Sequence, residues 1–194
     1  MIEPLPEISS AELGALHERL VTGATRDGSL DVAYRTVDTP VGSLLLAATE
    51  AGLVRVAYAV QGHDTALEVL AAQISPRILH APQRLDPAVR EIDEYFAGRR
   101  RVFDVALDLR LAQGFRHDVL AHLPQIGYGR TESYAQVAAA AGRPRAVRAV
   151  GTACALNPLP IVVPCHRVVR SDGTPGQYAG GATAKLALLG MEAA

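Results

Sequence analysis

One stretch of the sequence decides how the rest is interpreted: Pro160-Ile161-Val162-Val163-Pro164-Cys165-His166-Arg167-Val168-Val169. Pro164 lacks a backbone N–H and restricts the residue before it to an extended conformation, so the apolar run is predicted to be a strand that ends there. Cys165 would then lie on the following turn, where its side chain can face a pocket. A cysteine after an apolar strand is about as often an ordinary core residue, so the segments around it have to decide between the two interpretations.

The neighbouring histidine makes a nucleophilic role for Cys165 possible. A thiol becomes a good nucleophile when a nearby base or a helix N-terminus lowers its pKa. Adjacent side chains do not easily hydrogen-bond each other. The pair therefore predicts that His166 acts on Cys165 through a water molecule and that a third group orients the histidine.

The composition fits one large domain or two small ones. The chain has 194 residues, of which 49% are hydrophobic and 20% charged, and its formal net charge is −1. The overall charge therefore favours neither nucleic acid nor a membrane. Between residues 143 and 170, however, there is no acidic residue and there are five arginines: Arg143, Arg145, Arg148, Arg167 and Arg170. Such a cluster is a solvated face by default and an anion-binding surface by the more specific interpretation.

The sequence also limits the cellular setting. Cys154 and Cys165 are the two cysteines, too few for a disulfide framework or a four-thiolate zinc site. Free thiols fit a reducing compartment, and no apolar run is long enough to span a membrane. The segment Met1–Pro4 lacks the pattern of a signal peptide. We therefore expect a cytoplasmic protein that has neither a metal site nor a membrane partner.

The chain divides into three predicted parts. Residues 1–30 form an N-terminal extension, in which Ser9 and Glu12 make a plausible capping box. The helix that follows is predicted to dock through one apolar face, formed by Leu13, Leu16 and Leu20. Residues 31–110 are predicted to be an α+β scaffold, with strands over 32–37, 43–49, 53–59 and 103–109 and helices over 67–74 and 86–98. Asp86 is the expected cap of the second of these helices.

Residues 111–194 are predicted to form a mainly helical domain, with helices over 115–123, 134–141 and 144–156. Ser133 and Gln136 make a second capping box at the start of the middle helix. Only the tight turn Gly142-Arg143-Pro144 separates that helix from the next, and this spacing is typical of a helix-turn-helix.

The last of these helices has the features of a groove-binding helix. Its polar face carries Arg145, Arg148, Thr152 and Ala155, whereas its core face is expected to consist of Val147, Val150 and Cys154. Small residues such as Gly151 and Thr152 let a helix backbone approach a partner closely. Longer hydrogen-bonding side chains would be expected if the helix read base edges in a major groove. The pattern favours groove binding without sequence readout, with an ordinary helical hairpin as the alternative.

Together these segments resemble the O6-alkylguanine-DNA alkyltransferase family, the methylated-DNA–protein-cysteine methyltransferases. The resemblance is strong over about residues 103–194 and loose over 32–100. The matching segments are Ser133-Tyr134, Arg148-Ala149-Val150-Gly151, Asn157-Pro158 leading into the cysteine stretch, and Gly176-Gln177-Tyr178-Ala179-Gly180-Gly181 followed by Lys185. The resemblance implies an α+β protein with a ribonuclease-H-like N-terminal domain and a C-terminal, winged-helix-like helix-turn-helix domain that carries the acceptor cysteine.

The resemblance also implies a role for each residue of the site. The Cys165 thiolate would take the alkyl group from guanine O6 in one irreversible displacement. His166 would activate Cys165 through a water molecule, and Glu192 would orient His166. Tyr134 would donate towards guanine N3, and Asn157 would tie the recognition helix to the cysteine segment.

The substrate implied by the resemblance is O6-alkylguanine in double-stranded DNA, with O4-alkylthymine as a second candidate. A helix-turn-helix in the minor groove would flip the nucleotide, and Arg148 would fill the space it leaves. Arg145, Gly151, Thr152 and Arg167 would contact the DNA. The base pocket would be lined by Pro160, Val168, Tyr178, Ala179, Gly180 and, unless it is an ordinary core residue, Cys154.

The implied protein is a single-turnover, monomeric transferase without a cofactor, and three alternatives belong to other classes. A non-catalytic binder of alkylated DNA would lack the acceptor cysteine. A cysteine hydrolase would bring its histidine from a distant part of the sequence. A transcriptional regulator would read bases through larger side chains than those of the predicted recognition helix.

Overall fold

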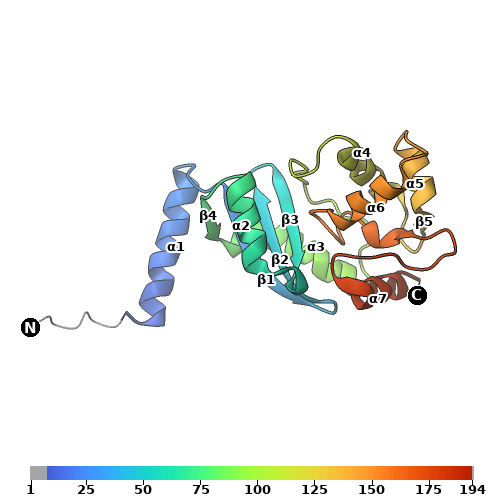
Figure 1. Ribbon diagram of the computed structural model, residues 1–194. Helices are drawn as coiled ribbons and strands as arrows, with labels where there is room; N and C mark the ends of the chain where they lie inside the picture. The colour runs from blue at the N-terminus through green and yellow to red at the C-terminus, as the bar shows by residue number, and fades with distance from the viewer. Residues whose placement is uncertain (1–7, 194) are drawn as a thin grey trace, which may run out of the picture.

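The computed structural model describes residues 8–193, in which a four-stranded sheet is followed by a mainly helical C-terminal half (Figure 1). Met1–Pro4 lie outside the described residues, so the prediction about a signal peptide is not tested. Within 8–193, no helix is both long and apolar enough to span a membrane.

The sheet has the strand order β3-β2-β1-β4. β1 (Val32–Thr39), β2 (Gly42–Thr49) and β3 (Gly52–Tyr58) form an antiparallel meander, and the short β4 (Ile78–His80) pairs in parallel with β1. The three predicted strands of the meander are confirmed to within two residues at each end. β4 was not predicted, because its three residues carry no recognisable period.

The two faces of the sheet pack against different partners. α2 (His63–Gln73) covers one face and buries Ala66 and Leu70 against it. α3 (Asp86–Phe96) packs on the other side, where Leu44, Leu46 and Tyr58 belong to the main core. This core continues into the C-terminal half and includes Val150, Cys165 and Leu188. The sheet and the C-terminal helices therefore share one core.

Two predictions for the segment 31–110 are wrong. The segment 103–109 is not a strand, because Glu91 Oε2 accepts the backbone N–H groups of Asp104 and Val105 at 2.8 and 3.2 Å, and only an isolated bridge joins this segment to β3. Asp86 does not cap α3 but pairs with Arg35 at 2.8 Å.

α1 (Ser10–Arg26) stands at one edge of the molecule (Figure 1). Its predicted capping box, Ser9 with Glu12, is confirmed. The predicted docking face does not dock on the described chain, since its three leucines are 50–62% exposed. The helix is held instead near its other end, where Val21 and Ala24 pack beside Leu30, Ala33 and Ala81.

The C-terminal half contains the three predicted helices and one more. The helices are α4 (Phe115–His122), α5 (Tyr134–Ala140), α6 (Val147–Ala155) and α7 (Gly181–Ala193). Two short strands, β5 (Glu132–Ser133) and β6 (Val168–Val169), pair in parallel. Four 3-10 turns complete the described part of the chain: η1 (Ala59–Gln61), η2 (Pro82–Leu85), η3 (Leu123–Gln125) and η4 (Cys165–Arg167).

The helix pair α5–α6 confirms most of the predicted helix-turn-helix. The capping box of Ser133 and Gln136 opens α5 as expected. α6, however, begins three residues later than predicted, because Arg143 to Ala146 form a turn closed by a backbone hydrogen bond of 2.8 Å. The later start leaves Val147 38% exposed, so its predicted place in the core is wrong.

Candidate functional site

The cysteine segment runs through the interior of the C-terminal half. Every residue from 157 to 169 is buried. Cys165 opens η4, and the chain then enters β6 beside β5. The segment directly follows α6 in the chain, and its turn η4 packs against the C-terminal helix α7.

The apolar run before Cys165 is a turn, and the predicted strand is wrong. Asn157 Nδ2 donates to Val163 O at 2.8 Å, and Asn157 Oδ1 accepts from Leu159 N at 3.0 Å. Ile161 takes a φ of 75°, which β-branched residues rarely adopt. The prolines at 158, 160 and 164 remove donors that a strand would need. The Asn157 side chain thus supplies the hydrogen bonds that a strand partner would have supplied.

Cys165 is 1% exposed, and its Sγ accepts a hydrogen bond from Asn157 Nδ2 at 3.1 Å. Burial raises the pKa of the Cys165 thiol to about 11, although the Asn157 hydrogen bond and the positive charge of Lys185 act in the opposite direction. The thiol is therefore protonated at neutral pH. The expectation of a lowered pKa is wrong for the unbound protein, and a base has to remove the proton during the reaction.

Glu192 lies beside the histidine, as the resemblance implied. Its Oε1 atom is 3.0 Å from His166 Nε2, and both side chains are fully buried. Burial alone would raise the pKa of Glu192, but the hydrogen bonds from His166 and Arg167 outweigh this effect and lower it to about 2. Glu192 is thus an ionised carboxylate in the interior.

The ionised carboxylate fixes the protonation of the histidine. Burial lowers the pKa of His166, and the hydrogen bond to Glu192 only partly offsets this effect, so the imidazole is neutral. A carboxylate can only accept, so His166 Nε2 carries the hydrogen. His166 Nδ1 is therefore the basic nitrogen. It is buried and has no hydrogen-bond partner within residues 8–193.

Arg167 has a different role from the one predicted. It is 5% exposed and donates through Nε and Nη2 to the two oxygens of Glu192, both at 2.9 Å. Its Nη1 atom donates to Ile126 O at 2.6 Å. A guanidinium held in this way cannot reach a phosphate, so the predicted DNA contact is wrong. Its charge instead compensates the buried carboxylate.

A loop from Gly176 to Gly180 closes the site and is anchored from the N-terminal half. Tyr178 Oη lies 3.0 Å from Tyr58 Oη at the end of β3, and the Tyr178 ring stands edge-on to His166 at 6.2 Å between ring centroids. A Cβ at Gly180 would lie 2.6 Å from the Tyr58 ring, and one at Gly176 would collide with the Tyr134 hydroxyl. A side chain at either position would therefore force one of these tyrosines to shift.

The remaining predicted pocket residues differ in their burial. Val168 is buried and its carbonyl accepts a hydrogen bond of 2.6 Å from Lys185 Nζ on α7. Cys154 on α6 is 5% exposed, and its pKa is raised by burial and by the nearby Cys165. Pro160 is buried in the turn, whereas Ala179 and Gly180 are partly exposed. Among residues 8–193 no cluster of histidine, cysteine and acidic side chains could hold a metal ion.

The predicted DNA-facing residues are accessible. Arg148 and Thr152 are exposed on α6, Gly151 is partly exposed, and Arg145 is exposed on the turn before the helix. Tyr134, at the start of α5, is partly exposed, and its pKa is raised first by burial and then by the proximity of both cysteines. The helix-turn-helix thus presents arginines to solvent and a tyrosine to the cysteine site.

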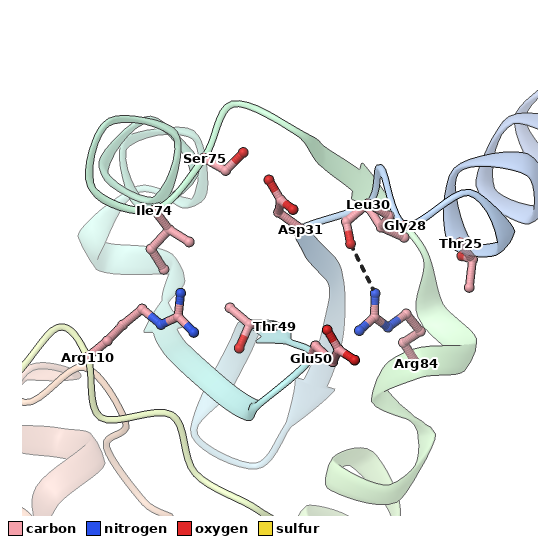
Figure 2. Close-up of a pocket in the computed structure, with 10 residues that line it drawn as sticks. All are labelled: Thr25, Gly28, Leu30, Asp31, Thr49, Glu50, Ile74, Ser75, Arg84 and Arg110. Carbon is pink, nitrogen blue, oxygen red and sulfur yellow. Dashed lines mark hydrogen bonds between the residues drawn. The ribbon is translucent and has the colours of Figure 1, made fainter.

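A prominent hollow of about 590 Å³ lies elsewhere, on the N-terminal half (Figure 2). Arg84 and Arg110 point into it from opposite sides, with Thr49 and Glu50 between them. Both arginines are already engaged, Arg84 with Leu30 O at 3.4 Å and Arg110 with Asp108 at 2.7 Å. None of the residues lining this hollow belongs to the cysteine segment. The chemistry of the side chains, rather than the size of a hollow, therefore locates the candidate site.

Sequence reasoning missed the contribution of the N-terminal half to the site. Tyr95 on α3 donates to Glu192 Oε1 at 2.7 Å, and the backbone N–H of Gly129 lies 3.3 Å from Oε2. The residues that α3 buries are Ala88, Glu91, Ile92 and Tyr95. A buried tyrosine hydroxyl needs a hydrogen-bond partner. This requirement was the one feature of the sequence that could have pointed to a partner for Tyr95.

Comparison with known proteins agrees with this geometry. The chain matches two sequence models of one family, "6-O-methylguanine DNA methyltransferase, ribonuclease-like domain" over residues 32–109 and "6-O-methylguanine DNA methyltransferase, DNA binding domain" over residues 114–194. The chain is 40% identical over 167 residues to the methylated-DNA–protein-cysteine methyltransferase of Mycobacterium tuberculosis, covering 83% of this chain and 92% of that protein. The constitutive enzyme of Bacillus subtilis is 38% identical over 164 residues, with 82% and 94% covered.

Solved structures give the same result. The crystal structure of M. tuberculosis OGT in complex with DNA superposes with a TM-score of 0.73 at 38% identity, covering 83% of this chain and 92% of that one. The O6-methylguanine-DNA methyltransferase of Pyrococcus kodakaraensis superposes with a TM-score of 0.58 at 25% identity, with 84% and 99% covered. The chain therefore belongs to the 6-O-methylguanine DNA methyltransferase family.

Proposed function

We propose that this chain repairs double-stranded DNA by moving the alkyl group of O6-alkylguanine onto Cys165. Membership of the family makes the reaction a transfer of an alkyl group from DNA to a protein cysteine. The observation that carries the assignment of the acceptor is the buried Asn157–Cys165 contact beside the His166–Glu192 pair. Because the C–S bond formed is stable, each molecule acts once.

The proposed reaction uses the protonation states set by burial. A water molecule bridges the Cys165 thiol to His166 Nδ1, which takes up the proton. Glu192, already ionised, stabilises the imidazolium that forms. The thiolate attacks the alkyl carbon, so that the C–S bond forms as the C–O bond breaks and its electron pair moves to the guanine. Burial raises the pKa of Tyr134, so its hydroxyl is protonated before the reaction. It can then donate this proton towards guanine N3.

The target must first leave the base stack, at a cost of about a few kcal/mol. We propose that α6 lies in the minor groove, that Gly151 and Thr152 allow its close approach, and that Arg148 fills the vacated space. Arg145 would contact phosphate. The structurally similar M. tuberculosis OGT was crystallised in complex with DNA, which supports DNA binding by this fold. The flipped base would lie among Pro160, Val168, Cys154, Tyr178, Ala179 and Gly180.

The remaining proposals follow from the same site. Its residues all come from one chain, which supports a monomer as the active form. Cys154 and Cys165 are free thiols, which fits the cytoplasm. O4-alkylthymine is a second candidate substrate. A non-catalytic binder of alkylated DNA is the alternative, and the presence of Cys165 disfavours it.

Intact-mass measurement tests the proposal. The protein is mixed with a duplex carrying one O6-methylguanine, and a gain of about 14 Da located on Cys165 is expected. Cys165→Ser should bind the same duplex and gain no mass. If the wild-type protein binds the duplex without gaining mass, the alternative function replaces this one. If Cys165→Ser still gains the methyl group, the acceptor is wrongly assigned.

A further inference from the structure

The Glu192 carboxylate receives more hydrogen bonds than its role beside His166 requires. Oε2 is held by Arg167 Nε and by the N–H of Gly129. Oε1 is held by His166 Nε2 at 3.0 Å, by Arg167 Nη2 at 2.9 Å and by the Tyr95 hydroxyl at 2.7 Å. Tyr95 thus gives the shortest of these bonds, and it binds the same oxygen as the histidine.

Tyr95 reaches Glu192 from the N-terminal half of the protein, 97 residues away in sequence. It lies on the last turn of α3 and is completely buried. Its ring packs against Phe96 and Phe103 at 5.3 Å and against Tyr128 at 6.2 Å between centroids. A phenylalanine could make these ring contacts equally well, so packing does not explain the hydroxyl. Burial raises the pKa of Tyr95, which keeps the phenol a neutral donor.

We propose that Tyr95 is a positioning residue, whose hydroxyl holds Glu192 Oε1 where His166 Nε2 meets it. The N-terminal half would thereby complete the proton relay that serves Cys165. This inference rests on the proposed function, because it presumes that the relay activates Cys165 for alkyl transfer. Without the hydroxyl, the carboxylate would be positioned only by Arg167, on both oxygens, and by Gly129, on Oε2, and the imidazole would lose its defined orientation.

The charged and titratable groups around His166 determine how the relay responds to pH. From α7 come Glu192 and Lys185, from η4 Arg167, and from the closing loop Tyr178. Tyr95 and His166 both bind the same carboxylate oxygen, Oε1 of Glu192. Removing the Tyr95 hydroxyl therefore leaves Oε1 a stronger acceptor for the hydrogen on His166 Nε2, which should raise the pKa of His166. The pKa of Glu192 should also rise, because the Tyr95 hydrogen bond helps to lower it, but the hydrogen bonds from His166 and Arg167 keep Glu192 ionised at neutral pH.

The experiment compares Tyr95→Phe with Tyr128→Phe in the full-length protein. Tyr128 is the matched control, because its ring contacts Tyr95 while its hydroxyl donates to Met191 O at 3.4 Å and not to Glu192. Single-turnover transfer from a duplex carrying O6-methylguanine is followed from mildly acidic to alkaline pH. Binding of the duplex and the melting temperature are measured on the same samples.

Tyr95→Phe should slow transfer at neutral pH by about tenfold, at the lower end of what outer-shell partners contribute. It should also move the acid-side inflection of the rate to higher pH, with DNA binding unchanged. Tyr128→Phe should leave both the rate and the inflection at their wild-type values. An inflection that does not rise in Tyr95→Phe, whatever the rate, overturns the positioning role. Absence of transfer in the wild-type protein would instead refute the proposed function.

Discussion

Two arginines at the recognition helix can be distinguished at the scale of single residues. Arg148 lies on α6 itself, whereas Arg145 lies on the turn before it, and both are exposed. A residue that replaces a flipped nucleotide acts on the cost of extrusion. A residue that pairs with phosphate acts on binding to any duplex. The two roles can be separated with substrates that do and do not need flipping.

Arg148→Ala should slow transfer from duplex DNA by about tenfold or more, since flipping costs about a few kcal/mol and each 1.4 kcal/mol corresponds to about a factor of ten. Its reaction with free O6-benzylguanine, which needs no flipping, should stay at the wild-type rate. The control Arg145→Ala should weaken binding to all duplexes and reduce the salt slope by about one. Equal losses of Arg148→Ala on the two substrates would contradict the flipping role.

The identity of the central residues and the Glu192–His166 contact were predictable from the sequence, but most of the other contacts were not. The adjacency of Cys165 and His166 is a local feature, and the sequence shows it directly. Glu192 and Asn157 were assigned only through the resemblance, because their partners lie far away in the chain or across a turn. Arg167 was misassigned because an arginine next to a candidate site looks like a phosphate ligand. Only the fold shows that it compensates a buried carboxylate.

At the scale of elements, local signals were reliable where local interactions decide the structure. Both capping boxes and the strands that form β2 and β3 were predicted, since each depends on residues a few positions apart. The run before Cys165 has the composition of a strand, yet the Asn157 side chain and the three prolines make it a turn. The segment 103–109 alternates like a strand, yet Glu91 takes its backbone donors. In both cases a buried side chain makes the backbone hydrogen bonds that a neighbouring strand would otherwise make.

α1 contributes little to the packing of the protein. It buries no residue of its own, and its contact with the body consists mainly of Val21 and Ala24 near the C-terminal end and a hydrogen bond between His17 and His80 O at 2.6 Å. Residues 1–31 also precede the part that the family models match. The site therefore does not depend on α1.

Deleting residues 1–20 should leave the rate of alkyl transfer at the wild-type value. It should lower the free energy of unfolding less than a longer deletion does, because it removes the exposed His17–His80 hydrogen bond but retains Val21 and Ala24. Deleting residues 1–27 should also keep the rate but lower the free energy of unfolding by about 1 kcal/mol, as small apolar contacts are lost. Calorimetry and single-turnover kinetics on the two truncated proteins test this. A slower transfer in the shorter deletion would show that α1 takes part in the reaction.

At the scale of the whole molecule, one buried carboxylate joins parts that are distant in sequence. Glu192 on α7 is bonded to α3 through Tyr95, to the loop before β5 through Gly129, and to η4 through His166 and Arg167. The main core spans the same regions. The charge state of Glu192 should therefore influence the stability of the entire fold.

The sign of this dependence follows from the pKa values. The pKa of Glu192 is lowered to about 2 in the folded protein, against about 4.3 in an unfolded chain. Its contribution to stability is therefore complete above about pH 4.5 and is lost as the pH falls towards 2. Asp31 is the matched control, because its pKa is also lowered to about 2, first by the hydrogen bonds from Arg77, but its carboxylate lies at the surface.

Glu192→Gln should destabilise the protein at neutral pH by about 3–5 kcal/mol, because it leaves the charge of Arg167 buried without its partner. It should also flatten the fall in stability below pH 4.5. Asp31→Asn should have little effect on the stability at neutral pH or on its fall below pH 4.5, since a surface ion pair is screened by solvent and salt. Urea unfolding of the three proteins across this pH range makes the comparison. If Asp31→Asn flattens the curve as much as Glu192→Gln does, surface pairs rather than the buried carboxylate control the acid stability of this fold.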